Sequence, residues 1–259
     1  MKVLSWNILH GGGRRLPWIA LEVLDEAPDV VCLTEYRNGI GGGQLRGVLA
    51  DHGLCYQHAT DAARGRNGIL VAARMPIGTL NEASPKLVTL ELPEAGLALT
   101  AAHLPDARRG DLKAETRKSA AWHAVLDEAR ARRGGYHAVL GDFNTGRHRI
   151  DEDGTTFTCT ALMGQLRTLG YLDSWADRPE RPLCDPRAVT WTSHTGAGFR
   201  LDHTWCSPPL AARVRGVDYR HGPRLRGLSD HSAMVVELSE PSKNSEFGGP
   251  LATPTQKTL

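Results

Sequence analysis

The sequence predicts an α/β fold in which two mostly antiparallel sheets pack face to face and carry helices on their outer faces. Short apolar segments recur along most of the chain and alternate with turn residues, a pattern typical of many strands. Only a few segments have helical periodicity. Strands that are apolar on both faces need cover on both sides, and two packed sheets with helices outside provide it.

The first half of the chain is expected to be rich in strands. Residues 2–8 and 29–34 are predicted buried strands that flank an amphipathic helix. This helix begins near Pro17, which suits a first helical turn, and carries Trp18, Leu21 and Leu24. The glycines at 11–13 and 41–43 are expected in loops. Further short segments, separated by Gly, Pro and Asn, predict an antiparallel meander of strands at 55–60, 67–73, 77–82, 87–92 and 97–103.

The second half begins with the clearest helix. A helix over roughly 110–131 is predicted because Trp122, Val125, Leu126 and Ala129 recur at helical spacing. A buried strand over His137–Gly141 follows it. The remaining predicted elements are a helix around 159–169 and strands near 188–192, 200–206, 214–219 and 233–239.

Composition indicates a globular chain. The 259 residues are 41% hydrophobic and 23% charged, which is enough apolar material for a large core. No linker divides residues 1–239, so we expect one catalytic domain there, whereas the polar, Pro/Gly-rich segment 240–259 is expected to be a disordered tail. The apolar runs fall far short of the roughly 20 residues that a transmembrane helix needs. With no apolar leader visible, we expect a cytoplasmic protein with no membrane partner and no obligate protein partner.

Charge and cysteine content exclude some function classes. Lys and Arg number 31 against 29 Asp and Glu, and the net charge of +2 is no global footprint for a polyanion. Arginine pairs in expected loops, such as Arg108 with Arg109, suit bidentate phosphate contact, although solvated loop charge is the alternative. The 5 cysteines are scattered and odd in number, which disfavours a disulfide scaffold and a structural zinc site.

Polar residues at the ends of apolar strands are the best candidates for chemistry. Asp142 and Asn144 follow the strand at 137–141, and in an extended backbone they share a face, so we expect a carboxylate and an amide directed into a cleft. An Asp beside a turn is by itself usually turn chemistry. Asn7, Glu35 and His103 end other strands in the same manner, and Glu35 would be costly there unless it is paired or bound to a cation.

The C-terminal part adds carboxylates and imidazoles. Asp202 and Asp230 each precede a histidine, and an Asp held near a His orients the imidazole and stabilises its charge. For His203, as for His194 and His221, we favour a structural or surface role. Oxygen donors with imidazole, and no thiolate cluster, suit Mg²⁺ or Mn²⁺. Phosphate-loop, dinucleotide-binding and Gly-x-Ser-x-Gly motifs are absent from the sequence.

These motifs, taken in order, resemble the endonuclease/exonuclease/phosphatase superfamily over residues 2–239. The matching segments are Trp6-Asn7, Leu33-Thr34-Glu35, Asn67-Gly68-Ile69-Leu70, His103-Leu104-Pro105, Gly141-Asp142-Phe143-Asn144, Arg200-Leu201-Asp202 and Ser229-Asp230-His231. The resemblance implies a four-layered α/β sandwich and cleavage of phosphoester bonds with a divalent cation. Members include abasic-site endonucleases, deoxyribonuclease I, sphingomyelinases and inositol polyphosphate phosphatases.

Within that superfamily the chain looks most like the exonuclease III type of abasic-site endonuclease. On this resemblance Trp191, Phe199 and Leu201 stand where relatives line an apolar pocket for a flipped, base-less sugar, and ordinary core packing is the alternative. Three positions depart from the pattern. His103 stands where abasic endonucleases usually have Tyr, and Asp106 replaces an Asn. Leu9 stands where several relatives have an acidic residue.

The resulting hypothesis is in-line attack of water on a DNA phosphodiester at an abasic or otherwise damaged site. Asp142 orients or deprotonates the water with help from Asn144, and His231, braced by Asp202, stabilises the transition state. The remaining assignments are Glu35 and Asp230 as ligands of Mg²⁺ (Mn²⁺ is the other candidate), Asn7 at the metal or the phosphoryl group, His103 as proton donor or phosphate ligand with an ordinary pKa near 6.5, and Arg109 at the substrate.

Two other hypotheses remain open. One is a metal-dependent phosphoesterase that acts on RNA, phospholipid or a small phosphorylated metabolite, which the near-neutral net charge allows. The other is a catalytically silent nucleic-acid-binding module, against which the complete set of acid, amide and imidazole groups argues.

Overall fold

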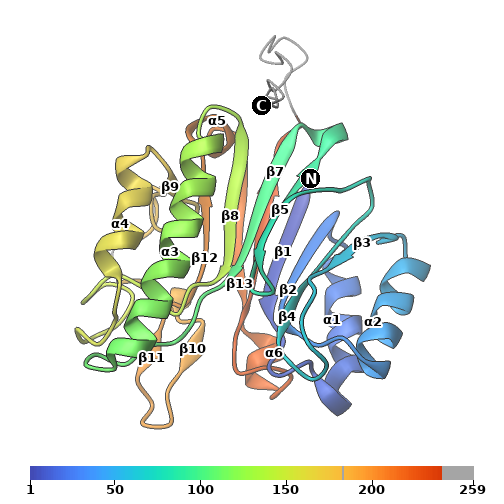
Figure 1. Ribbon diagram of the computed structural model, residues 1–259, viewed down its shortest axis with the longest axis horizontal. Helices are drawn as coiled ribbons and strands as arrows, with labels where there is room; N and C mark the ends of the chain where they lie inside the picture. Colours follow the sequence, from blue (N-terminus) through green and yellow to red (C-terminus); the bar gives the residue numbers. More distant parts are fainter. Residues whose placement is uncertain (183, 241–259) are drawn as a thin grey trace, which may run out of the picture.

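The predicted four-layered sandwich is confirmed. The structure, a computed structural model, describes residues 1–182 and 184–240. Two six-stranded sheets form the inner layers, with α1 and α2 outside one sheet and α3 and α4 outside the other (Figure 1). Each sheet contains one parallel pair, β1 with β2 and β7 with β8, among antiparallel neighbours.

The strands and helices have the following bounds. The first sheet has the order β13-β14-β1-β2-β4-β3, formed by Val214–Arg220, Ala233–Leu238, Lys2–Asn7, Val30–Tyr36, Gly68–Ala73 and Tyr56–Ala59. The second has the order β5-β6-β7-β8-β12-β9, formed by Gly78–Ser84, Leu87–Leu92, Leu97–His103, Tyr136–Asp142, Asp202–Cys206 and Leu172–Asp173. A separate hairpin consists of β10 (Trp191–Thr192) and β11 (Gly198–Phe199). The helices are α1 (Leu16–Asp25), α2 (Ile40–Asp51), α3 (Leu112–Arg132), α4 (Thr160–Thr168), α5 (Pro208–Ala211) and α6 (Gly222–Leu225), and short 3₁₀ helices lie at Gly13–Arg15, Pro93–Ala95 and Pro186–Ala188.

The strands bury both faces, as their apolar composition predicts. In β1, Val3 packs into the cluster between the sheets, whereas the next residue, Leu4, packs beneath α1 and α2. In β8, Leu140 faces the space between the sheets and Val139 packs beneath α3. Successive side chains of a strand point to opposite faces, so a central strand in this fold is apolar at nearly every position.

The helix predicted to begin near Pro17 is present as α1, but its expected apolar face and the expected loop at 41–43 were wrong. In α1 the buried side chains are Ile19, Ala20 and Val23, whereas Trp18 is 61% exposed and Leu21 49% exposed. The glycines at 41–43 are not in a loop but in the first turns of α2, which the sequence did not predict. A Cβ atom on Gly42 would lie 2.2 Å from the Arg37 carbonyl oxygen, so close packing, not helix propensity, explains glycine there.

Other boundaries also differ. The predicted meander is divided, because β3 and β4 pair in the first sheet and β5, β6 and β7 pair in the second. The strand expected at 188–192 contains only Trp191–Thr192, preceded by a 3₁₀ helix. The tail expected at 240–259 lies, after Glu240, outside the described residues. Within residues 1–182 and 184–240, no helix has the combined length and apolarity that crossing a membrane requires.

Candidate active site

The ends of four central strands meet at one edge of the sandwich. Asn7 ends β1 and is paired with Thr34 of β2, the neighbour of Glu35, while His103 and Asp142 end β7 and β8 and are paired with each other. Parallel strands end at the same edge of a sheet, so each parallel pair brings its polar residues together. The Asn7 amide Nδ2 donates to Asp142 Oδ2 at 3.0 Å and lies 3.4 Å from Glu35 Oε1. This amide group therefore connects the polar edges of the two sheets.

Asp142 is held by the turn that follows it. The Asn144 backbone N–H donates to Asp142 Oδ1 at 3.0 Å, and Asn144 Nδ2 donates to the Leu104 carbonyl at 3.0 Å and approaches Asp142 Oδ2 at 3.4 Å. The two side chains do lie together, but not through an extended backbone as expected, because Asn144 is left-handed at φ 46°. Burial raises the pKa of Asp142, while His231 and the hydrogen bonds from Asn144 and Asn7 act in the opposite direction.

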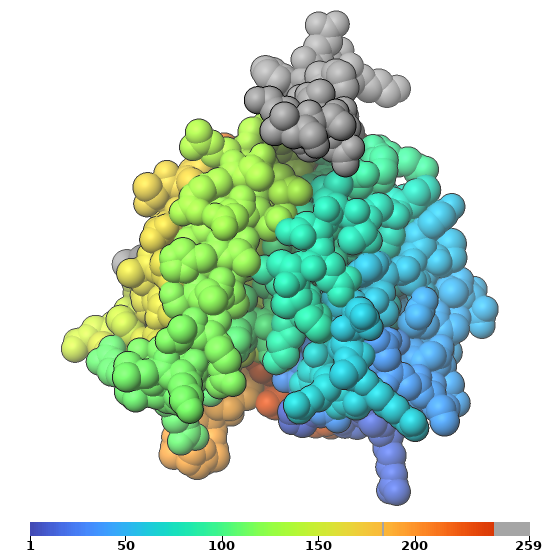
Figure 2. Space-filling view, in the orientation of Figure 1, coloured from blue at the N-terminus to red at the C-terminus, as the bar shows by residue number. Residues whose placement is uncertain are grey.

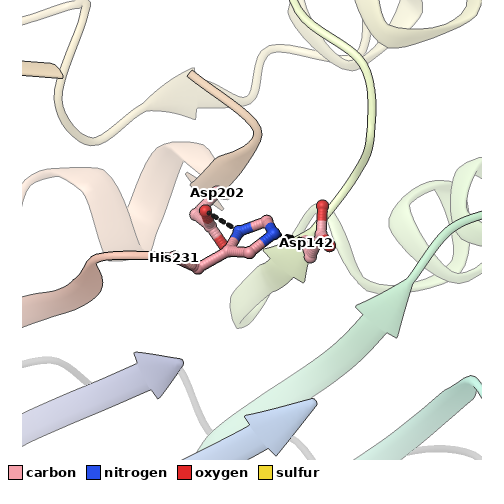
Figure 3. A group of neighbouring side chains, drawn as sticks. All are labelled: Asp142, Asp202 and His231. Atoms are coloured by element: carbon pink, nitrogen blue, oxygen red, sulfur yellow. Dashed lines mark hydrogen bonds and ion pairs between the residues drawn. The ribbon is translucent and has the colours of Figure 1, made fainter. Parts of the chain in front are cut away.

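His231 lies between two carboxylates (Figure 3). Its Nδ1–H donates to Asp202 Oδ2 at 2.8 Å, and its Nε2 lies 3.8 Å from Asp142 Oδ2. Burial by itself lowers the pKa of His231, but the carboxylates of Asp202 and Asp142 outweigh it and raise the pKa. The imidazole is therefore a cation directed at Asp142.

The backbone around His231 is fixed by the first sheet. Its carbonyl accepts from the Trp6 indole N–H at 2.9 Å, and its N–H donates to Ser229 Oγ at 3.1 Å. The Ser229 hydroxyl in turn donates to the Asn7 carbonyl at 2.5 Å. The Ser229-Asp230-His231 segment is thus attached to the end of β1, which sets the position of the imidazole.

The Glu35 carboxylate is bound by His10, a residue that the sequence did not suggest. The His10 backbone N–H donates to Glu35 Oε2 at 2.7 Å, and His10 Nδ1 lies 2.8 Å from the same oxygen. Both residues have positive φ, 53° at His10 and 58° at Glu35, so two left-handed turns face each other. The signal that could have identified His10 is its place three residues after Asn7, immediately before the glycines at 11–13.

His103 lies in the site but not in the expected protonation state. Its Nε2 is 3.7 Å from Glu35 Oε1 and 3.8 Å from Asp142 Oδ2, and the side chain is buried. Burial, followed by the positive charge of Lys86, lowers its pKa to about 3, so the expected pKa near 6.5 was wrong. A neutral imidazole at neutral pH can donate or accept a hydrogen bond, but it is not an imidazolium proton donor. Its Nδ1 atom has no hydrogen-bond partner in the described residues.

Asp230 and the aromatic hairpin lie beside His231. The Trp191 indole N–H donates to Asp230 Oδ2 at 3.0 Å, while Asp230 Oδ1 is buried without a partner in the described part of the chain. Trp191 pairs with Phe199 across β10 and β11, with ring centroids 5.6 Å apart, and also forms a bridge with His231. Trp191 and Phe199 are partly exposed, whereas Leu201 is buried.

Two basic residues differ from expectation. Arg109 is exposed in the connection between β7 and α3, and for its guanidinium the described residues provide no contact with the site. Lys118, which the sequence did not suggest, is buried on α3 and donates its Nζ–H to the Asn144 carbonyl. The signal for Lys118 was its position one turn before Trp122, on the apolar face of the helix.

The donor set fits a hard divalent cation. The Glu35 and Asp142 carboxylates converge on the Asn7 amide, and within residues 1–182 and 184–240 no Lys or Arg forms an ion pair with either. Oxygen ligands of this kind suit Mg²⁺ and Mn²⁺. Ligand atoms of Asp142, Asp202 and His231 also lie within 4.8 Å of one another. In that group His231 donates a hydrogen bond to Asp202 through Nδ1.

Comparisons with known proteins agree with this fold. The model of the Endonuclease/Exonuclease/phosphatase family matches residues 4–231. No curated protein matches the chain significantly. Similar solved structures are the 3′ phosphatase NExo from Neisseria bound to a product DNA hairpin (20% identity, TM-score 0.76) and an AP endonuclease from Archaeoglobus fulgidus (18%, 0.77). The 3′-5′ exonuclease NExo from Neisseria meningitidis is similar at 21% and 0.75, and each of the three alignments covers 92% of this chain and 99% of the other. At these identities the likeness shows the fold.

Proposed function

The chain belongs to the endonuclease/exonuclease/phosphatase family, and we propose that it is a divalent-metal-dependent phosphodiesterase that cuts DNA at abasic or otherwise damaged sites in DNA repair. The observation that carries this proposal is the convergence on Asp142 Oδ2 of Asn7, Asn144, His103 and His231, from both sheets. DNA as the substrate is supported by the solved structures of similar fold, which include an AP endonuclease and a 3′-5′ exonuclease.

Glu35 and Asn7 are the proposed metal-binding residues, with Asp230 as a further ligand because its Oδ1 has no partner within the described residues. Mg²⁺, or Mn²⁺, is the proposed ion. When bound, the ion neutralises negative charge on the phosphoryl and leaving oxygens. His10 holds the Glu35 carboxylate from the far side through its backbone N–H.

Asp142 is the proposed general base. Its carboxylate accepts a proton from the attacking water, whose oxygen then forms the new bond to phosphorus while the bond to the leaving oxygen breaks. Asn7 and Asn144 donate hydrogen bonds to Asp142 and so fix the direction of its free lone pairs. Burial raises the pKa of Asp142, which makes it a better proton acceptor than an exposed carboxylate.

His231 is the proposed stabiliser of the transition state. Its Nε2–H is directed into the site, and Asp202 keeps the imidazole charged and correctly oriented. The neutral imidazole of His103 donates a hydrogen bond to the phosphate. Solvent protonates the leaving oxygen. The partly exposed Trp191 and Phe199 are proposed to receive the base-less sugar beside His231.

The test is cleavage of an end-labelled duplex that bears one abasic site, run beside the intact duplex and a duplex with a 3′-phosphate end, each with Mg²⁺ and with a chelator. The proposal expects a single metal-dependent incision at the lesion. Release of only the terminal phosphate would assign a 3′-phosphatase, and degradation of both duplexes would assign a general nuclease. If none of these DNA substrates reacts but RNA or a small phosphoester does, the proposal is wrong.

The matched variant is Asp142→Asn, which keeps the shape of the side chain and removes the base. Cleavage should fall by about 10³-fold or more, within the range that general bases contribute. The melting temperature should stay near that of the wild type, because a neutral amide is easier to bury than a carboxylate. Near-normal turnover in a folded Asp142→Asn protein would contradict the assigned role.

A further inference from the structure

A groove of about 790 Å³ leads away from His103 across the outside of the sandwich. The α3 helix forms its floor, and the loop at 62–67 with the turn between β5 and β6 forms its wall. Figure 2 shows the surface hollowed in its lower half, where the green segment that includes α3 faces the cyan segment that includes the loop at 62–67. The volume is in the range of ligand-binding pockets, roughly 300–1,000 Å³. The groove reaches the site itself, since His103 is among its lining residues.

The groove carries only positive charge. Arg37, Arg66, Lys86 and Arg117 line it, and no carboxylate is among the lining residues. None of the four has an ion-pair partner in the described ranges of the chain, although many other arginines, such as Arg147, are paired with a carboxylate. Uncompensated cations around one groove attract an anion.

The floor of the groove is apolar and made of small side chains. Arg117, Ala120, Ala121 and Ala124 lie at i, i+3, i+4 and i+7, so they share one face of α3. A helix face with alanine at these positions leaves room that larger side chains would fill. Arg117 lies at the end of this face nearest the N-terminus of α3, and the three alanines follow it along the helix.

At its inner end the groove is lined by polar groups that either lack a hydrogen-bond partner in the described residues or also contact the residues around Glu35. His103 is buried and lines the groove, and its Nδ1 atom has no hydrogen-bond partner in the described residues. Asn67 accepts from Arg37 Nε at 2.6 Å and approaches His10 Nδ1 at 3.4 Å, and His10 contacts Glu35. A ligand in the groove would therefore contact the same side chains that surround Glu35.

We propose that this groove binds an unpaired nucleic-acid strand that continues from the phosphate being cleaved. The inference rests on the proposed function and adds to it a preference for substrates with a single-stranded extension. Phosphates would lie on the four cations, and sugars and bases on the alanine floor. A duplex directs its bases inward and presents only phosphates, so it would not use the apolar floor; an unpaired strand exposes both.

The test measures binding of the full chain with Asp142→Asn, which blocks cleavage, to fluorescein-labelled nucleic acid by anisotropy. The probes are a blunt DNA hairpin, the same hairpin with a single-stranded DNA tail, and the same hairpin with an RNA tail. The tailed probes should bind several-fold more tightly than the blunt one. Each of Lys86→Gln and Arg117→Gln should reduce the advantage of the tail by about twofold, the effect of losing one partly exposed ion pair. Each should also lower the salt slope by about 0.7, the value for one phosphate contact on a single strand.

Two further variants keep the result interpretable. Arg133→Gln removes an exposed arginine at the far end of α3, outside the groove, and should change nothing. Ala120→Glu places a carboxylate on the exposed part of the groove floor and should abolish the advantage of the tail. If blunt and tailed probes bind equally and the variants have no effect while the wild type still cleaves DNA, the groove proposal is overturned and the proposed function survives. If no probe binds and the wild type cleaves no DNA, both are overturned.

Discussion

At the scale of single residues, Asp142 and His231 illustrate how burial and charge are balanced. A buried carboxylate resists ionisation and a buried imidazole resists protonation, yet here each is the other's neighbour at 3.8 Å. Asp202 adds a second negative charge beside His231 at 2.8 Å, and this charge keeps the imidazole protonated. The order Asp202, His231, Asp142 therefore places a cation between two carboxylates, next to the carboxylate that accepts the proton.

We predict that Asp202→Asn lowers kcat by about 10²-fold while KM changes little. The amide keeps the size of the side chain but removes the charge that holds His231 as an imidazolium, and an interaction made mainly in the transition state affects kcat. Steady-state kinetics on the cleaved DNA substrate would measure this. Asp218→Asn, an exposed carboxylate, is the control. A rise in KM with unchanged kcat would show instead that Asp202 serves substrate binding.

At the scale of secondary structure elements, the site depends on the close approach of β7 and β8. Gly141 precedes Asp142 and has φ 133°, a conformation that other residues rarely adopt. A Cβ atom there would lie 2.0 Å from the Ala102 carbonyl oxygen of β7. Glycine is therefore required for the parallel pair to stay in contact up to its last residues, His103 and Asp142.

We predict that Gly141→Ala lowers the free energy of unfolding by about 3 kcal/mol, since both the backbone conformation and the space for the methyl group are unfavourable. Urea denaturation would measure the change. Gly134→Ala is the matched control, because nothing lies within 4 Å of a Cβ atom there, and its stability should be nearly unchanged. Equal effects of the two substitutions would contradict the close-approach argument.

At the scale of the whole molecule, polar groups buried in the second sheet connect its layers. Arg200 pairs with Asp151 at 2.8 Å and with Asp173 at 2.7 Å, all of them buried. His137 lies between the Thr100 hydroxyl at 2.8 Å and the Tyr171 hydroxyl at 2.6 Å. Burial, followed by the charge of Arg132, lowers the pKa of His137 to about 3. These groups make the stability of the whole domain depend on pH.

We predict that folding stability falls as the pH drops below about 6.5. The unfolded chain binds a proton at His137 near its ordinary pKa of 6.5, whereas the folded chain excludes it down to about 3, so the loss occurs between these values. One such group changes the slope of the free energy of unfolding against pH by up to about 1.4 kcal/mol per pH unit. Denaturation of His137→Gln at several pH values should show a correspondingly flatter profile. The pKa of His103 is also lowered by burial, but His103 is present in both the wild type and His137→Gln, so its effect on the pH dependence of stability is the same in the two proteins.

We also propose that residues 1–239 form the catalytic unit. The Ser239 N–H donates to the Arg213 carbonyl at 2.8 Å, and the Arg213 guanidinium donates back to the Ser239 carbonyl, directly after β14 ends at Leu238. A chain that ends at Glu240 should keep its activity and melt within about 2 °C of the full chain, as calorimetry would show. A chain that ends at Val235 loses half of β14, which pairs with both β1 and β13, and should not fold.

Local patterning is enough to predict the layered α/β architecture and most strands, because it reports burial directly: β6 and β7 have the predicted bounds. The sequence also provided the candidates Asn7, Glu35, His103, Asp142, Asn144, Asp202 and His231, which the structure brings into one cluster. Polar residues at the ends of apolar strands are visible without coordinates, and it is their recurrence at several strand ends, not an Asp beside a single turn, that indicates a site.

Which groups are in contact, and how they are charged, depends on the packing of segments that are distant in sequence. The burial that lowers the pKa of His103 comes from surrounding elements distant in sequence. Contacts with other elements also explain the hydrogen bond from His10 to Glu35 and the one from Lys118 to the Asn144 carbonyl. Close packing around Gly42 likewise accounts for glycine in α2. Local sequence records the character of each side chain, whereas distances and desolvation depend on how both sheets and their helices pack together.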